Sequence, residues 1–310
     1  MDGGVPLIIS SVVSLEDVQR RLDQVLSSTD QSQKVLNYVA MTTGKMLRPT
    51  LVLLSFDLCR GSRYAEAINV ATGVELVHLA SLIHDDIVDN GELRRGQLTV
   101  HRRFGTQVAV LAGDHLFAGA FKLFSLSDSK VTQLMTTIIQ DMCSGEINQL
   151  LAPITVEQQY WNYIYLKTAR LIGGCCRLGA ILSDQEHLLG DTLQKLGESI
   201  GFAFQVTDDV LDYRGSDSTM GKRRGRDFQE QIWTLPIIRA YNRGLIPYDW
   251  ASMDFETVYG ILEAGGIFEE VWSVAASYVQ NAIRILDDFP ATISKEEMFR
   301  LVTKLTRRDT

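Results

Sequence analysis

Apolar residues recur at intervals of three and four along most of the chain, the spacing of one face of an α-helix. Segments in which apolar and polar residues alternate are nearly absent, and no hairpin dipeptide stands between two such segments. The pattern therefore predicts an all-α protein. A first helix is expected to start at Ser14, with acidic residues in its first turn. Further helices are expected near residues 31–42, 47–60, 64–90, 106–126, 128–151, 157–182, 186–214, 231–243, 254–264, 267–287 and 294–307.

Two of the predicted helices are apolar on almost every side. They carry the segments YAEAINVATGVELVHLASLIHDDIVD and ESIGFAFQVTDDVLDY. A surface helix would show a wide polar face, so both are expected to be central and buried. The chain has only 6 prolines, which permits long uninterrupted helices. No linker-like stretch or repeat divides it, so we expect one domain over residues 1–310.

Composition limits the class of partner. The 30 Lys and Arg against 38 Asp and Glu give a net charge of −8, which disfavours a nucleic-acid or anionic-membrane surface built on bulk charge. The 4 cysteines form neither a disulfide scaffold nor a zinc-binding pair. No basic leader and no run of 18 uncharged apolar residues is present, so we expect a cytoplasmic protein without a transmembrane segment.

Two clusters of aspartates share one spacing, i, i+1, i+4, and each follows one of the buried helices. The first contains Asp85, Asp86 and Asp89, and the second contains Asp208, Asp209 and Asp212. Carboxylates at i and i+4 face the same way, and they repel each other unless a cation lies between them. A solvated acidic turn would explain one such triplet, but two on buried helices favour Mg²⁺ with phosphate oxygens as further ligands.

Basic residues lie beside both clusters. Lys45 and Arg48 are three apart in GKMLRP, Arg94 and Arg95 follow the first cluster, and Lys222 follows the second. Each alone would be an ordinary solvated charge. Arginine binds phosphate oxygens two at a time and lysine acts as a point charge, so the placement predicts a phosphorylated ligand.

Helical phase adds further polar candidates. His78 lies seven residues before Asp85, two turns away on the same face, and Gln205 lies three before Asp208. Lys167 and Thr168 interrupt an otherwise apolar helix. A lone buried polar residue is usually a satisfied core residue, but His78 and Gln205 lie on the faces that carry the carboxylates.

At this point the sequence resembles the trans-isoprenyl diphosphate synthase (polyprenyl synthetase) family, medium- or long-chain type. The shared motifs are GKMLRP, DDIVD followed by RRG, GTQVAVLAGDHLFA, LKTA, and GFAFQVTDDVLD followed by GK and TLP. The resemblance covers nearly the whole chain. It implies the isoprenoid synthase helical bundle, with the two aspartate clusters facing each other across a central cavity. It also implies a dimer, with a homodimer expected and a heterodimer left open.

The resemblance implies a role for each candidate residue. Metal ligands would be Asp85, Asp89 and Asp208, with Asp86, Asp209 and Asp212 in support or binding through water. Isopentenyl diphosphate would lie on Lys45, Arg48, His78 and Arg95. The allylic diphosphate, farnesyl or geranylgeranyl, would lie on Mg²⁺, Arg94 and Lys222, with Lys167, Thr168 and Gln205 beside the reacting carbon.

These residue types suit ionisation of an allylic carbon–oxygen bond. Cations stabilise the departing diphosphate, while the hydroxyl of Thr168 and the carbonyl oxygens at Lys167 and Gln205 face the allylic cation. The double bond of isopentenyl diphosphate then attacks, and the released diphosphate accepts the proton. A dry cavity protects the cation from water.

One departure from the family pattern stands out. Where the family has Gly-Lys before T-L-P, this chain has Gln231 and Ile232, so one cation toward the diphosphate is absent. We expect Arg223, Arg224 or Arg226 to replace it. The alternatives are weaker allylic affinity and a site that a partner subunit completes.

Product length is expected to depend on the turn below Asp85. Ala80 and Ser81 occupy positions where short-chain synthases carry Phe or Tyr, so a product longer than C20 is predicted. Alternatively, a large residue further from Asp85 would close the cavity in which the product chain grows.

Two other functions are compatible with parts of this pattern. A class I terpene cyclase would carry an N-D-x-x-S-x-x-x-E second site, and DDVLD argues against it. A non-catalytic or partner-dependent subunit of a heteromeric synthase would tend to lose aspartates; all six are present, but Ile232 leaves that reading open.

Overall fold

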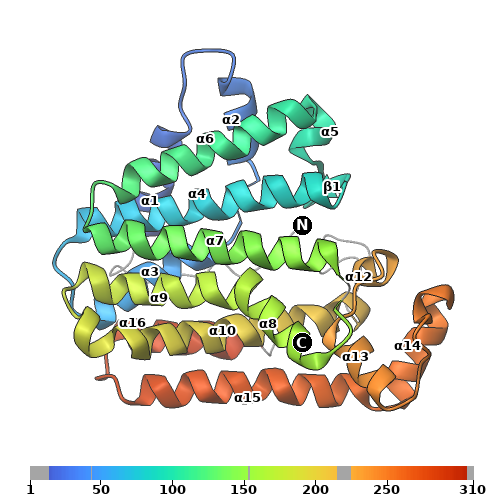
Figure 1. Cartoon of the computed structure of the whole chain (residues 1–310). Coiled ribbons are helices and arrows are strands. Elements are labelled where there is room, and N and C mark those ends of the chain that lie inside the picture. The colour runs from blue at the N-terminus through green and yellow to red at the C-terminus, as the bar shows by residue number, and fades with distance from the viewer. Residues whose placement is uncertain (1–13, 43, 153, 215–224, 306–310) are drawn as a thin grey trace. The chain divides into compact units, whose positions relative to one another are not determined.

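The computed structural model describes residues 14–42, 44–152, 154–214 and 225–305 (Figure 1). These residues form helices joined by short turns, together with one two-stranded hairpin. The all-α prediction is confirmed. Lys222, Arg223 and Arg224 lie outside the described residues, as does the end of the last predicted helix.

The helices follow one another with few long connections. Their bounds are α1 Leu15–Val25, α2 Gln33–Ala40, α3 Leu47–Leu58, α4 Tyr64–Val88, α5 Val100–Phe104, α6 Thr106–Phe124, α7 Ser129–Leu151, α8 Glu157–Ile164, α9 Arg170–Leu182, α10 Glu186–Arg214, α12 Arg226–Gln229, α13 Leu235–Asn242, α14 Phe255–Ala264, α15 Ile267–Asp287 and α16 Ile293–Lys304. A π-helical turn, η1 Tyr165–Ala169, joins α8 to α9, and a 3₁₀ turn, η2 Trp250–Ser252, precedes α14. Strand β1 Leu93–Arg94 pairs antiparallel with β2 Gln97–Leu98.

The predicted helices at 186–214 and 267–287 match α10 and α15, and most others end within two or three residues of their expected bounds. The helix expected over 231–243 starts only at Leu235. Gln231 has a left-handed backbone (φ 55°), and Pro236 fixes the first turn of α13, as proline does when its missing N–H needs no partner. The hairpin, α5, α12 and η2 are too short to leave a periodic signal.

The chain divides into two compact units. The first contains residues 1–133, 175–191 and 289–299, and the second contains residues 134–174, 192–288 and 300–310. Each unit carries one of the aspartate clusters. The expectation of a single domain stays a prediction.

In the first unit, α4 is the central helix and lies alongside α6 (Figure 1). Glycines allow this close packing. A Cβ at Gly73 would lie 2.5 Å from the ring of Phe124, and one at Gly113 would lie 2.1 Å from the ring of His84. By length and composition α4 is apolar enough to cross a membrane, but 72% of its most apolar window is buried within the protein, as expected of a core helix.

The second unit has an aromatic core. Tyr213 at the end of α10 stacks on Phe255 and contacts Phe268, while Trp250 is 1% exposed against Phe228. Apolar side chains of α10 belong to this core, which therefore holds the part of that helix that carries the second aspartate cluster.

Candidate active site

The first aspartate cluster ends α4. Asp86 is buried at 4% exposure, Asp85 is partly exposed and Asp89 is exposed at the C-cap. Asn90 then adopts a left-handed backbone (φ 50°), and its N–H donates to the carbonyl of Ile87 at 3.2 Å. The N–H of Gly91 donates to the carbonyl of Asp86 at 2.9 Å. This arrangement satisfies the last carbonyls of α4 and fixes where the helix ends.

Arg94 lies against Asp86 rather than in open solvent. Its Nε is 3.0 and 2.8 Å from the two carboxylate oxygens, and its Nη2 is 2.7 Å from Oδ1. The side chains are 17% and 6% exposed, so the pair is largely removed from water. A bidentate pair of this kind fixes the direction of the guanidinium. Asp86 therefore holds Arg94 in place. Its expected role beside the metal ligands stays a prediction.

The residues between the two strands form a tight turn. Arg95 and Gly96 both have positive φ, 52° and 76°, as a two-residue hairpin loop requires. Arg95 donates through Nη1 to the carbonyl of Thr42, and its guanidinium lies where a Cβ on Gly44 would be, 2.4 Å from Nη2. The hairpin thus carries Arg95 back to the segment that precedes α3.

That segment places the other predicted cations. Lys45 is exposed just before α3, and Arg48 lies partly buried in the first turn of α3. Met46 has a left-handed backbone (φ 50°), and its carbonyl accepts from the hydroxyl of Thr50 at 2.8 Å. The entry into α3 is therefore fixed at Met46, which lies between Lys45 and Arg48.

His78 lies within the electrostatic reach of three of these arginines. Burial first, and then the charges of Arg48, Arg95 and Arg94, lower the pKa of His78 well below its usual value. The ring is therefore neutral at pH 7, with one nitrogen able to donate and the other able to accept. Four of the predicted site residues, Arg48, His78, Arg94 and Arg95, therefore lie near one another in the first unit. Their roles toward the substrates stay predictions.

Glu75 was missed by the sequence analysis. It is 2% exposed on α4, and its Oε2 has no hydrogen-bond partner among the described residues. Burial raises the pKa of Glu75, while Arg48 and Arg95 lower it. Glu75, His78, Asp85 and Asp89 follow one another at intervals of three, seven and four, and so share one face of α4. A charged residue in an otherwise apolar helical stretch was the available signal.

The second cluster lies near the end of α10. Asp208 is partly exposed, whereas Asp209 is 3% and Asp212 is 9% exposed. Asp212 accepts from the backbone N–H groups of Arg226 and Asp227, at 3.3 and 3.0 Å, and so ties the start of α12 to α10.

Asp209 joins a chain of hydrogen bonds with two predicted catalytic residues. Thr168 donates its hydroxyl to Oε1 of Gln205 at 2.8 Å, and Nε2 of Gln205 donates to Asp209 at 3.0 Å. The hydroxyl of Tyr160 donates to the other oxygen of Asp209 at 2.7 Å. Burial raises the pKa of Asp209 to about 6, although its bonds to Tyr160, Gln205 and the N–H of Leu235 oppose the rise. Thr168 and Gln205 are therefore fixed by one buried network.

Lys167 and Thr168 lie in the π-helical turn η1. Such a turn inserts a residue into the helix and frequently occurs at functional sites because it disturbs the carbonyl ladder. The ammonium of Lys167 contacts the hydroxyl of Tyr163 at 2.6 Å and Oε1 of Glu146 at 2.8 Å. Burial would lower the pKa of Lys167, but Tyr163 and Glu146 outweigh it and raise the pKa, so the side chain is charged. Because the Lys167 side chain is bound to Tyr163 and Glu146, the backbone of this turn is the part that can face a ligand.

The donor set fits a hard divalent cation bound with few protein ligands. Among the described residues, no group of three His, Cys, Asp or Glu side chains lies close enough to hold a metal alone. Asp86, Asp209 and Asp212 are buried and bonded to Arg94, to Gln205 and to backbone N–H groups, respectively. Asp85, Asp89 and Asp208 are at least partly exposed to solvent. Mg²⁺ in phosphoryl sites takes one or two carboxylates and completes its shell with water and substrate oxygens.

The positions expected to control product length lie one turn below Asp85. Ala80 is fully buried, and Ser81 is partly exposed with its hydroxyl donating to the carbonyl of His78 at 2.9 Å. Gly73 lies further from Asp85 on the same helix, α4, and Phe124 of α6 fills the space beside it. The described residues therefore include one large side chain below the two small ones.

The residues that depart from the family pattern lie in a compact turn. The N–H of Ile232 donates to the carbonyl of Asp227 at 2.8 Å, and Ile232 is partly buried. Of the arginines expected to replace the absent lysine, Arg226 pairs with Glu230 through Nε at 2.6 Å. Arg226 is therefore already engaged with an acid.

Comparison with known proteins agrees with this arrangement. The polyprenyl synthetase family matches residues 29–245. The sequence is 35% identical over 278 residues to a prenyl transferase of Cyanophora paradoxa, covering 84% of each chain. It is 34% identical to the octaprenyl diphosphate synthase of Haemophilus influenzae, covering 92% of this chain and 86% of that protein.

Solved structures show the same similarity. The heptaprenyl diphosphate synthase of Staphylococcus aureus superposes with a TM-score of 0.88 at 28% identity, covering 96% of this chain and 98% of that one. The polyprenyl synthase of Caulobacter crescentus, a complex with calcium and isoprenyl diphosphate, superposes with a TM-score of 0.86 at 27% identity, covering 97% and 100%. The chain belongs to the polyprenyl synthetase family. It is a prenyltransferase with the all-α isoprenoid synthase fold.

Proposed function

We propose that the chain is a trans-polyprenyl diphosphate synthase, joining isopentenyl diphosphate head-to-tail (1′–4) to farnesyl or geranylgeranyl diphosphate and giving products longer than C20. The observation that carries the proposal is the convergence of Arg48, His78, Arg94 and Arg95 beside the aspartates that end α4. Relatives named as heptaprenyl, octaprenyl and decaprenyl diphosphate synthases support the product length.

The diphosphate of isopentenyl diphosphate would lie on Lys45, Arg48, His78 and Arg95, with neutral His78 hydrogen-bonding an oxygen. The allylic diphosphate would lie on Arg94, held by Asp86, and on Lys222. Bound Mg²⁺ would neutralise charge on the leaving diphosphate, and Asp85, Asp89 and Asp208 are the carboxylates we assign to it.

The chain's own groups would then guide the reaction. As the allylic carbon–oxygen bond breaks, the diphosphate leaves with the electron pair. The hydroxyl oxygen of Thr168, oriented by Gln205, and the backbone carbonyl of Lys167 in the π turn would face the positive carbon. The double bond of isopentenyl diphosphate forms the new carbon–carbon bond, and the lost proton passes to the released diphosphate.

A heteromeric enzyme is the second arrangement that an observation favours. Two relatives are named component 2 of heptaprenyl diphosphate synthase. The site would then need a second chain, which would supply what Gln231 and Ile232 omit.

The test is incubation of the purified chain with radiolabelled isopentenyl diphosphate, farnesyl diphosphate and Mg²⁺, followed by chromatography of the products. Asp208→Asn should lower turnover at least a hundredfold. Asp191→Asn, a change at an exposed position on the same helix, should leave turnover unchanged. No product of any length, with or without a second chain from the same source, would falsify the proposal.

A further inference from the structure

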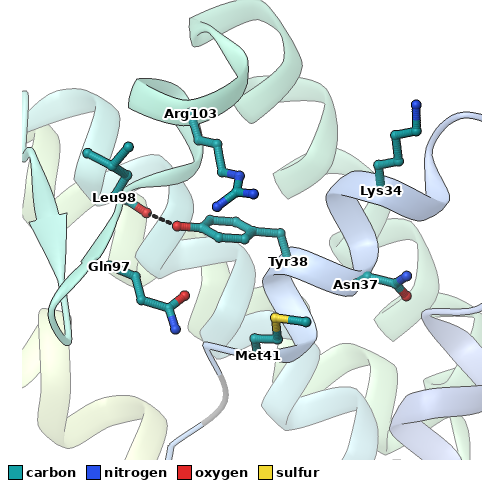
Figure 2. A pocket seen from close by; sticks show the side chains of 7 residues that line it. All are labelled: Lys34, Asn37, Tyr38, Met41, Gln97, Leu98 and Arg103. Carbon is teal, nitrogen blue, oxygen red and sulfur yellow. Dashed lines mark hydrogen bonds between the residues drawn. The ribbon is translucent and has the colours of Figure 1, made fainter.

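A cavity of about 360 Å³ opens between α2, β2 and α5 in the first unit (Figure 2). Its volume lies within the range of small-molecule sites. None of its residues has a role in the reaction described above. The lining residues are Lys34, Asn37, Tyr38, Met41, Gln97, Leu98 and Arg103.

Tyr38 and Arg103 form a fixed centre to this cavity. Figure 2 shows the guanidinium of Arg103 over the Tyr38 ring, with the guanidinium carbon 4.3 Å from the ring centroid. The hydroxyl of Tyr38 donates to the carbonyl of Leu98 at 2.5 Å, and Tyr38 is 6% exposed. Stacking on an aromatic ring restrains a guanidinium without neutralising it. The charge of Arg103 is therefore held in a defined place.

Among the residues that the structure describes, neither cation of the cavity has an acidic partner. Within the described part of the chain, no ion pair joins Lys34 or Arg103 to a carboxylate. The neighbouring Arg102 contrasts with them, because it bonds Oδ1 of Asn90 at 3.1 Å and lies 3.7 Å from Glu92. Two uncompensated cations at one cavity are notable in a chain of net charge −8.

The remaining lining residues are apolar or amide-bearing. Met41 is 72% exposed and Leu98 is 48% exposed, which leaves apolar surface beside the cations. Asn37 and Gln97 supply amide donors and acceptors. A ligand with an anionic group and a short apolar part would match both halves, and an inorganic anion would leave the apolar half uncovered.

We propose that this cavity binds an amphipathic anion: a phosphate or carboxylate joined to a short apolar group. The anionic group would lie on Arg103, and the apolar group would cover Met41 and Leu98. Lys34, whose side chain points away from Arg103 in Figure 2, would add positive charge at the cavity without bonding the same group. The source is either a free short-chain ester or a lipid headgroup, which share this chemistry.

Occupancy would also act on the hairpin. Leu98 lies on β2, which pairs with β1. Arg94 lies on β1, and Arg95 lies in the turn between the two strands. A ligand that bridges α2 and β2 would hold the hairpin in its present position and lower the ordering cost of binding a diphosphate there. We therefore expect the ligand to lower the KM for isopentenyl diphosphate about fivefold. This part rests on the proposed function, and the binding site itself does not.

The test uses n-octyl phosphate below its micelle concentration, titrated calorimetrically into the full chain with EDTA present so that metal-dependent anion binding is suppressed. One saturable site per chain is expected. Arg103→Ala should weaken binding at least tenfold and Arg102→Ala less than twofold. Both variants remove one positive charge from α5, so the pair controls for net charge. Lys34→Gln provides a second variant outside α5.

The outcomes are distinct. No saturable binding, or equal weakening by Arg103→Ala and Arg102→Ala, overturns the site. Flotation with phosphatidylcholine vesicles containing phosphatidic acid, compared with phosphatidylcholine alone, identifies the lipid source if the same two variants differ there. Binding of n-octyl phosphate with an unchanged KM for isopentenyl diphosphate overturns the coupling to the hairpin. If the wild-type chain forms no product at all, the proposed function is refuted, but the result of the binding experiment still stands.

Discussion

Asp86 and Arg94 form a three-bond contact across the turn that ends α4, with all three N···O distances between 2.7 and 3.0 Å. One of the six clustered aspartates is thus occupied by an arginine of the same unit. The contact links the aspartate-bearing end of α4 to the hairpin.

Asp86→Asn should therefore lower both stability and allylic affinity. Removing one partner of a buried pair leaves an uncompensated charge, so we expect a loss of about 3 kcal/mol in the free energy of unfolding. The KM for the allylic diphosphate should rise about tenfold as Arg94 loses its orientation. Urea denaturation and steady-state kinetics measure the two effects.

Asp89→Asn is the matched control, since Asp89 belongs to the same cluster but is exposed. It should raise the Mg²⁺ concentration needed for half-maximal rate with little change in stability. If Asp86→Asn behaves like Asp89→Asn, Asp86 is a metal ligand and not the support of Arg94.

His78 gives a dependence of stability on pH. Its pKa is lowered in the folded state, so below its ordinary pKa of about 6.5 the unfolded chain binds a proton that the folded chain does not. The free energy of unfolding should therefore fall as pH drops below 6.5, with a slope from this group of at most about 1.4 kcal/mol per pH unit.

His78→Gln should flatten that part of the stability curve, measured by urea denaturation between pH 5 and about 8. His187→Gln is the control, because His187 lies in the first turn of α10, whereas the arginines near His78 lie on α3 and in the hairpin. An identical slope in the wild type and in His78→Gln would contradict the assignment of a neutral, partly buried His78.

Thr168 and Thr207 allow a matched test of the hydrogen-bond network. Thr168 donates to Gln205, whereas the buried hydroxyl of Thr207 has no hydrogen-bond partner among the described residues. Thr168→Val should lower kcat about tenfold or more and cost about 1 kcal/mol of stability, because Gln205 loses a partner. Thr207→Val should be neutral or stabilising. The idea fails if the two variants have the same kcat.

Product length should respond to bulk below Asp85. Ala80→Tyr is expected to shorten the product, but Ala80 is fully buried, so a tyrosine there also strains the core. Ser81→Phe is the milder variant because Ser81 is partly exposed. Phe124→Ala should lengthen the product if Phe124 closes the tunnel. Unchanged chromatographic profiles in all three would sink the prediction.

Long periodic helices were predictable from the sequence, and α10 and α15 match their expected bounds. The aspartate spacing and the basic residues near it supplied the candidate site residues, and helical geometry alone places His78 and Asp85 on one face of α4. The hairpin turn was not predictable, since Arg95-Gly96 is not a favoured hairpin dipeptide and its strands have two residues each. Glu75 was missed because its meaning depends on two arginines distant in sequence.

The hydrogen-bond partners of the aspartates could not be predicted from the sequence either. The spacing of Asp85, Asp86 and Asp89 does not distinguish their roles. The contact between Asp86 and Arg94 depends on how the hairpin packs against the end of α4. Likewise the π turn at Lys167 leaves no periodic trace, because one inserted residue shifts the apolar pattern by less than its natural irregularity.

The left-handed backbone of Arg95 sets stability and activity against each other at a single position. A non-glycine residue with this backbone lowers the free energy of unfolding by roughly 1 kcal/mol, and glycine or asparagine at position 95 would largely restore that stability. Either replacement would also remove a guanidinium that we assign to isopentenyl diphosphate. A thermostability screen that ignores turnover would therefore enrich Arg95→Gly and discard the enzyme's affinity for its substrate.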